Sequence, residues 1–174
     1  MQATAADAAH PVEEGALLRG QRLGGFIYGT IVVLSVIVAG ARAFPHEPGH
    51  VAVLCVATCG TFWLAHVYAH ALGHSLAHGE RVSFDELREI AGRELPLVES
   101  ALPPVVALLL GAFGVLEDNT ALWLASGLGL GVLAVQGVIF ARLERLGFLG
   151  MLLVVTVNVA LGLILVALKL FVTH

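Results

Sequence analysis

The chain has 174 residues, of which 58% are hydrophobic and 13% are charged, and its mean hydropathy is +0.91. A soluble domain of this length does not need so much apolar surface, so the composition predicts a protein whose solvent is lipid. The formal net charge is −4 and the nine basic residues are scattered, which argues against nucleic acid as a partner.

Residues 1–20 are small, polar and acidic, and they show no apolar period. We therefore expect a disordered cytoplasmic tail there. The rest, 21–174, is predicted to form a single all-α polytopic membrane domain. Five apolar stretches, each about long enough to cross a bilayer, predict transmembrane helices near 24–42, 51–77, 96–116, 120–140 and 148–172. Ala41-Arg42-Ala43 could be read as a signal-peptidase site, but the long apolar core before it favours an uncleaved span.

The stretch 51–78 contains two cysteines and then histidines at every fourth position. At about 100° per residue, these side chains fall on one slowly drifting stripe of a helix. Histidines four residues apart can present two imidazoles to one metal ion, and cysteines favour softer ions. The stripe consists of Cys55, Cys59, His66, His70, His74 and His78. Gly79 is a plausible cap for its end.

Residues 80–95 form the one long polar interlude. Ser83 with Glu86 makes a capping box, and apolar residues then recur at helical spacing, so we predict a short amphipathic helix at the membrane interface over about 83–94. In the following span, Pro103 and Pro104 should kink the helix and free backbone carbonyls. The next span contains glycines at 127, 129 and 131, a small-residue face suited to close helix packing.

Basic residues predict the orientation. With five spans and a cytoplasmic N-terminus, seven arginines lie inside and two basic residues lie outside, which favours N-in and C-out topology in the plasma (inner) membrane. The inside set is Arg19, Arg22, Arg81, Arg88, Arg93, Arg142 and Arg145, and the outside set is Arg42 and Lys169.

This topology predicts a polar site in the inner half of the bilayer. Glu99 should enter the membrane at the depth of His70, and ionisable groups in lipid mark functional sites because they are costly unless paired or wetted. We expect Glu99, His66 and His70 to hold a divalent transition metal ion, with Zn, Fe, Ni and Cu all compatible. Gln136 and Asn158 would line the polar cavity, while Asp85, Glu86 and Glu89 would gather cations at the cytoplasmic mouth. A series of open sites suits a transporter or channel, with protons exchanging through the same histidines.

Other interpretations stay open. The cysteines can be small packing residues, the histidines can snorkel to the interface, and the acidic residues can form a solvated helix face. A non-catalytic membrane interaction or assembly protein is an alternative function. A membrane metalloenzyme or haem protein is a second alternative, although no HxxHH motif occurs and no other predicted span supplies a histidine. We do not expect an enzyme.

The predicted architecture, together with ESALPPVVALLLGAF in the third span, resembles the vacuolar iron transporter family. The shared features are five spans, a second helix that continues into the cytoplasm, and an acidic amphipathic segment before the third helix. The resemblance implies a homodimer that moves divalent metal out of the cytoplasm in exchange for protons. It also implies that Asp85, Glu86 and Glu89 belong to a cytoplasmic metal-binding region. The family's aspartate-glycine pair has no counterpart in GFIYGTIVV of the first span.

Overall fold

The computed structural model describes residues 4–79 and 81–171, which form helices joined by short turns, without any strand in that part of the chain. The predicted all-α class is confirmed. The helices are α1 (Thr4–Ala43), α2 (Pro48–His78), α3 (Phe84–Glu99), α4 (Leu102–Ala112), α5 (Asp118–Leu143) and α6 (Phe148–Phe171).

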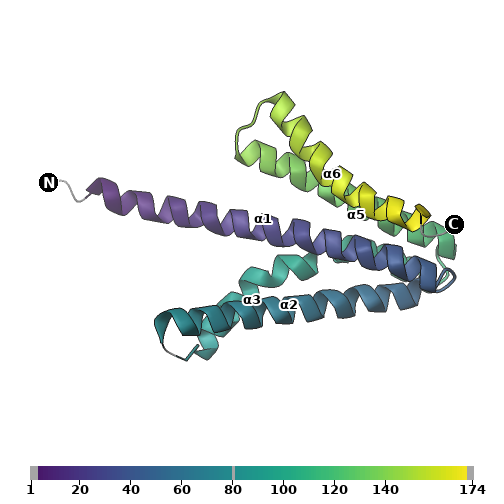
Figure 1. The fold of residues 1–174 in the computed structure, drawn as a ribbon, viewed down its shortest axis with the longest axis horizontal. Coiled ribbons are helices and arrows are strands. Elements are labelled where there is room, and N and C mark those ends of the chain that lie inside the picture. Colours follow the sequence, from purple (N-terminus) through teal and green to yellow (C-terminus); the bar gives the residue numbers. More distant parts are fainter. Residues whose placement is uncertain (1–3, 80, 172–174) are drawn as a thin grey trace.

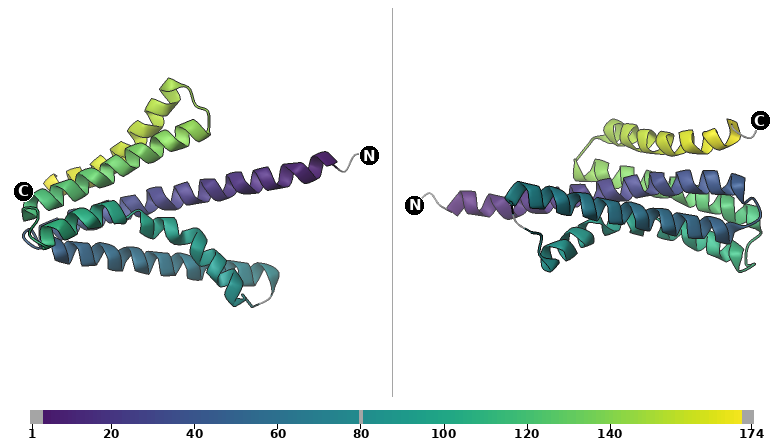
Figure 2. Two further views of the ribbon diagram at one scale, coloured as in Figure 1. Left: turned by 180° about the vertical axis from the view of Figure 1, so that it is seen from behind. Right: turned by 60° about the horizontal axis from the view of Figure 1, so that its bottom comes forward.

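Helix α1 is the centre of the arrangement. It packs against α2 and α3 on one side and against α5 and α6 on the other (Figure 1). The turns after α1 and α4 lie at one end of the molecule, and the turns after α2 and α5 lie at the other (Figures 1 and 2). The chain therefore passes from end to end five times, provided that α3 and α4 together count as one pass.

Several helices are apolar enough to lie in a membrane. Within the described residues, three segments are long and apolar enough to cross one: Arg19–Ala43, Pro48–Ala77 and Asp118–Leu143. The bent pair α3–α4 makes a fourth if it counts as one span, and Phe148–Ile164 is a shorter apolar helix. These helices are compatible with a multi-pass membrane protein.

Helix α1 begins much earlier than the sequence analysis predicts. Residues 4–20, expected to be a tail, form its first turns. This segment is rich in alanine, which has the highest helix propensity. The apolar span itself still starts near the predicted position, at Arg19.

The predicted boundary between the interfacial helix and the third span is wrong. Helix α3 continues through Pro96 to Glu99, and the chain then bends by 53° before α4. Pro96 has no N–H, so the Gly92 carbonyl loses its helical donor. Because Gly92 is exposed, the helix tolerates this loss and continues. Pro103 and Pro104 cannot donate to the carbonyls of residues 99 and 100, so the helix breaks there. The predicted kink at this proline pair is confirmed.

The helix ends on either side of the 79–83 turn are capped as predicted. Gly79 has φ +68° and its N–H bonds to the Ser75 carbonyl. The Ser83 N–H donates to Glu86 Oε2 at 2.8 Å, and the Glu86 N–H donates to Ser83 Oγ at 3.3 Å. The predicted capping box is confirmed, and it fixes where α3 begins.

The break between α3 and α4 is buried against α1. The hydroxyl of Ser100, fully buried, donates to the Leu97 carbonyl at 2.7 Å, while the Ala101 N–H bonds to Val98. Gly29 of α1 lies directly over this bend: a Cβ there would be 2.4 Å from both Leu97 O and Ser100 Oγ. Only glycine permits this close approach.

We therefore predict that Gly29→Ala destabilises the protein by about 1–3 kcal/mol, because the added methyl group overlaps backbone atoms that cannot move without opening the bend. The measurement is thermal unfolding in detergent. Gly60→Ala is the matched control, since a Cβ at Gly60 meets nothing within 4 Å. Equal unfolding temperatures for the two variants would contradict the role assigned to Gly29.

Candidate functional site

The cysteine part of the α2 stripe faces the protein interior. Cys55 and Cys59 are both completely buried and unbonded to other cysteines, and they belong to the core formed with α1, α3, α4 and α5. Their surroundings are apolar side chains such as Val33, Ile37 and Leu108. This environment fits the packing interpretation of the two thiols.

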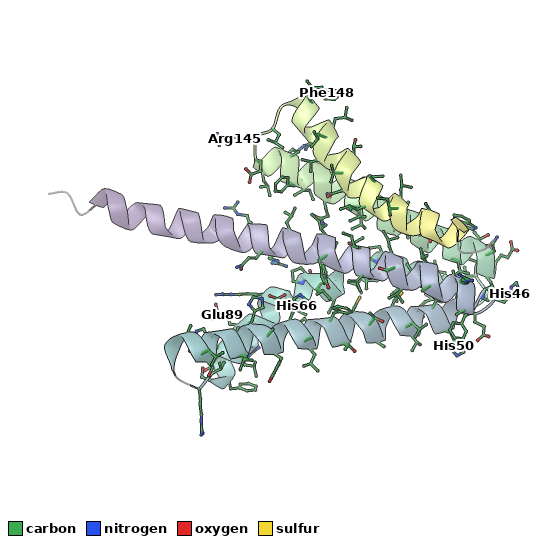
Figure 3. All side chains as sticks on the ribbon, viewed as in Figure 1. His46, His50, His66, Glu89, Arg145 and Phe148 are labelled. Carbon is green, nitrogen blue, oxygen red and sulfur yellow. The ribbon has the colours of Figure 1, made fainter. Side chains whose placement is uncertain are left out.

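His66 lies at the border between α2 and α1 (Figure 3). Its Nδ1 is 2.8 Å from the Phe62 carbonyl, and its ring centroid is 5.5 Å from that of Tyr28 on α1. A hydrogen bond from Nδ1–H to a backbone carbonyl would place the imidazole lone pair on Nε2. His66 therefore contacts α1 rather than α3.

His70 lies one turn further along α2 and faces α3. Its Nε2 is 3.4 Å from Glu94 Oε1, and the Glu94 side chain is only 18% exposed. Trp63, two turns before His70 on the same face, donates from Nε1 to the Ala91 carbonyl at 3.0 Å, which holds α2 and α3 together. Beside this pair is an open pocket of about 440 Å³, lined by Ala69, His70, Gly73, His74, Ile90 and Arg93. We call it the α2–α3 pocket.

Glu94 was missed by the sequence analysis, which favoured Glu99. The signal was present: at 100° per residue, Glu94 falls between Ile90, Leu97 and Val98, in the middle of the apolar face of α3. Glu99 falls about 140° away from Glu94 and instead meets Arg22 of α1, Oε2 to Nη2, at 3.7 Å. The expected approach of Glu99 to His66 and His70 does not occur in this structure.

Two of the three acidic residues predicted at the cytoplasmic mouth, Glu86 and Glu89, have local partners. Glu86 belongs to the capping box, and Glu89 pairs with Arg93 at 2.5 Å within the helix. Asp85 lies in the first turn of α3, where a carboxylate stabilises the helix by interacting with the positive end of its dipole. This arrangement corresponds to the solvated helix face that the sequence analysis left open.

The remaining predicted residues are separate from the α2–α3 pocket. Asn158 of α6 donates to the Leu133 carbonyl of α5 at 3.4 Å, so it links two helices. Gln136 is half-buried on α5. His74 lines the pocket. The His78 side chain lies outside the described part of the structure.

A closed metal site is not assembled. Among the side chains that the structure describes, no three His, Cys, Asp or Glu residues lie close enough together to hold a metal ion. What the geometry does provide is an imidazole paired with a largely buried carboxylate at the edge of a pocket, an arrangement that can exchange a proton or contribute two ligands to a cation.

Comparisons of the chain with protein-family models, with curated proteins and with solved structures find no match.

We predict that Cys55 and Cys59 resist maleimide in the folded protein and react only after unfolding in dodecyl sulfate, because neither sulfur is accessible. The measurement is the mass increase per chain before and after unfolding. Rapid labelling of the native protein would show that these thiols face a water-filled path, which the packing described above does not allow.

Proposed function

We propose that the protein is an integral membrane protein with five passes, with its N-terminus and the 79–83 and 144–147 turns on the cytoplasmic side. The alternating ends at which the turns lie support this topology, with α3 and α4 forming one broken pass and α6 the fifth. The excess of arginines near the proposed inner end gives the direction.

The topology predicts opposite labelling of single cysteines introduced into a chain with Cys55 and Cys59 replaced by alanine. In sealed cells, an impermeant maleimide should label Glu47→Cys and Asp118→Cys, because their turns lie outside. Arg81→Cys and Arg145→Cys should react only after the membrane is permeabilised. Labelling of all four positions from one side would contradict the five-pass topology.

We propose further that the α2–α3 pocket handles a cation, either protons or a divalent transition metal ion exchanged for protons. The observation that carries this proposal is the contact of His70 with Glu94. A carboxylate on the apolar face of α3, at the end of a membrane span, is costly unless it pairs or binds a cation. The vacuolar iron transporter resemblance points in the same direction.

Two protein ligands leave room on a metal ion for water, for His74, or for a side chain from a second copy of the chain. Zn, Fe, Ni and Cu all accept imidazole and carboxylate ligands, so the donor set alone selects none of them. A homodimer would bring two such pockets into one protein.

The test is uptake of Zn²⁺, Fe²⁺, Ni²⁺ and Cu²⁺ into proteoliposomes that contain a metal indicator and a pH dye. His70→Ala and Glu94→Gln should each lower uptake and bound metal at least about tenfold, because each removes one of the two protein ligands. His50→Ala is the control, since His50 lies at the other end of α2 and pairs with Glu47 (Figure 3).

Thermal unfolding of each variant separates loss of function from loss of structure. Unchanged metal content and flux in both variants would contradict the cation proposal. A wild-type protein that binds no metal and moves no protons would favour the alternative of a membrane interaction or assembly protein.

A further inference from the structure

A second pocket lies between α1 and the C-terminal end of α5, on the side of α1 away from the α2–α3 pocket. It has a volume of about 380 Å³ and is lined by Arg19, Gly20, Leu23, Gly24, Ile27, Phe140, Leu143 and Glu144. We call it the α1–α5 groove. Figure 2 shows that α1 and the α5–α6 hairpin diverge toward this end of the molecule.

The walls of the groove are apolar and smooth. The α1 wall follows the spacing i, i+3, i+4, i+7, so it is one face of the helix, and two of its four inner positions are glycine. A Cβ at Gly20 or Gly24 would meet nothing within 4 Å, so the glycines leave open space rather than a close helix contact. The groove is therefore not filled by this chain's described residues.

The position of the groove matches one leaflet of a bilayer. Its two charged residues lie at the boundaries of apolar spans, because Arg19 begins the span Arg19–Ala43 and Glu144 follows the span Asp118–Leu143. From Arg19 to Ile27 the helix rises about 12 Å, close to the roughly 15 Å of hydrocarbon in one leaflet. An occupant would have a charged end at the interface and an apolar part of about this length.

The two charges are of opposite sign and come from opposite walls. Arg19 offers guanidinium donors suited to a phosphate, and Glu144 offers a carboxylate suited to an ammonium group. A head group that contacts both residues carries one phosphate and one N–H-bearing cation. An acyl chain below it would occupy the apolar walls.

We propose that the α1–α5 groove is a binding site for phosphatidylethanolamine of the cytoplasmic leaflet. The phosphate binds Arg19, the primary ammonium binds Glu144, and one acyl chain lies along Leu23, Ile27 and Phe140. The site does not depend on cation handling at the α2–α3 pocket.

The experiment is native mass spectrometry of the full chain, released from nanodiscs that contain phosphatidylethanolamine, phosphatidylcholine and phosphatidylglycerol with identical acyl chains. The wild type should retain phosphatidylethanolamine about tenfold over the other two lipids, since each of them lacks one charge-assisted hydrogen bond or ion pair. Gly24→Leu should abolish retention by filling the groove. Glu144→Gln should remove the preference over phosphatidylglycerol, and Arg19→Gln should weaken retention of all three lipids.

Matched controls are Arg42→Gln, at the other end of α1, and Gly127→Leu, at an exposed glycine of α5 whose Cβ would also meet nothing. Both should retain lipid as the wild type does. Equal retention of the three lipids, preference for phosphatidylglycerol, or wild-type retention by Gly24→Leu would overturn the proposal. A lipid-free dimer that is lost in Gly24→Leu would overturn it as well, because the groove would then hold a second copy of the chain.

Discussion

The rest of the structure depends on how the backbone carbonyls find hydrogen-bond donors where the helix between Ser83 and Ala112 breaks. In lipid, a backbone carbonyl without a donor costs several kcal/mol, so a break is tolerated only where protein covers it. Here the Ser100 hydroxyl replaces the missing helical donor of Leu97, and α1 covers the bend through Gly29. One serine and one glycine thus permit a break that two prolines impose.

The bend decides which side chains of α3 meet α2. Because α3 stays helical through Pro96, the apolar face of the interfacial helix continues in register to Leu97 and Val98, and Glu94, which lies on this face, meets His70. Had the helix broken at Pro96, the residues after it would have followed the direction of α4. The same register turns Glu99 toward α1, where Arg22 neutralises it. The break after Glu99 therefore keeps Glu94 and Glu99 on one helix, about 140° apart, so each meets a different neighbouring helix.

Much of the fold could be predicted from the sequence because the length of an apolar stretch and the turn residues at its ends determine structure locally. The apolar stretches, the capping box at Ser83 and the kink at Pro103 depend on neighbours within one or two turns. The pairing of Glu94 could not be predicted in the same way, because it depends on the direction of α3 relative to α2. The helix before Arg19 was missed since polarity was read as disorder, although alanine favours helix without an apolar face.

The two pockets open at the same end because small residues close the opposite end. At the closed end a Cβ on Gly111 would be 2.5 Å from the Cβ of Ala121, and one on Gly40 would be 3.1 Å from Val51. At the open end Gly20, Gly24 and Gly73 face empty space. At Gly20 and Gly24 this leaves a gap where α1 and the α5–α6 hairpin diverge (Figure 2), and at Gly73 it leaves open space between α2 and α3, which the 79–83 turn joins. The α2–α3 pocket has an imidazole and a carboxylate at its edge, whereas the α1–α5 groove combines apolar walls with Arg19 and Glu144. The two openings therefore differ in the side chains of their facing helices, and those side chains determine what each opening can hold.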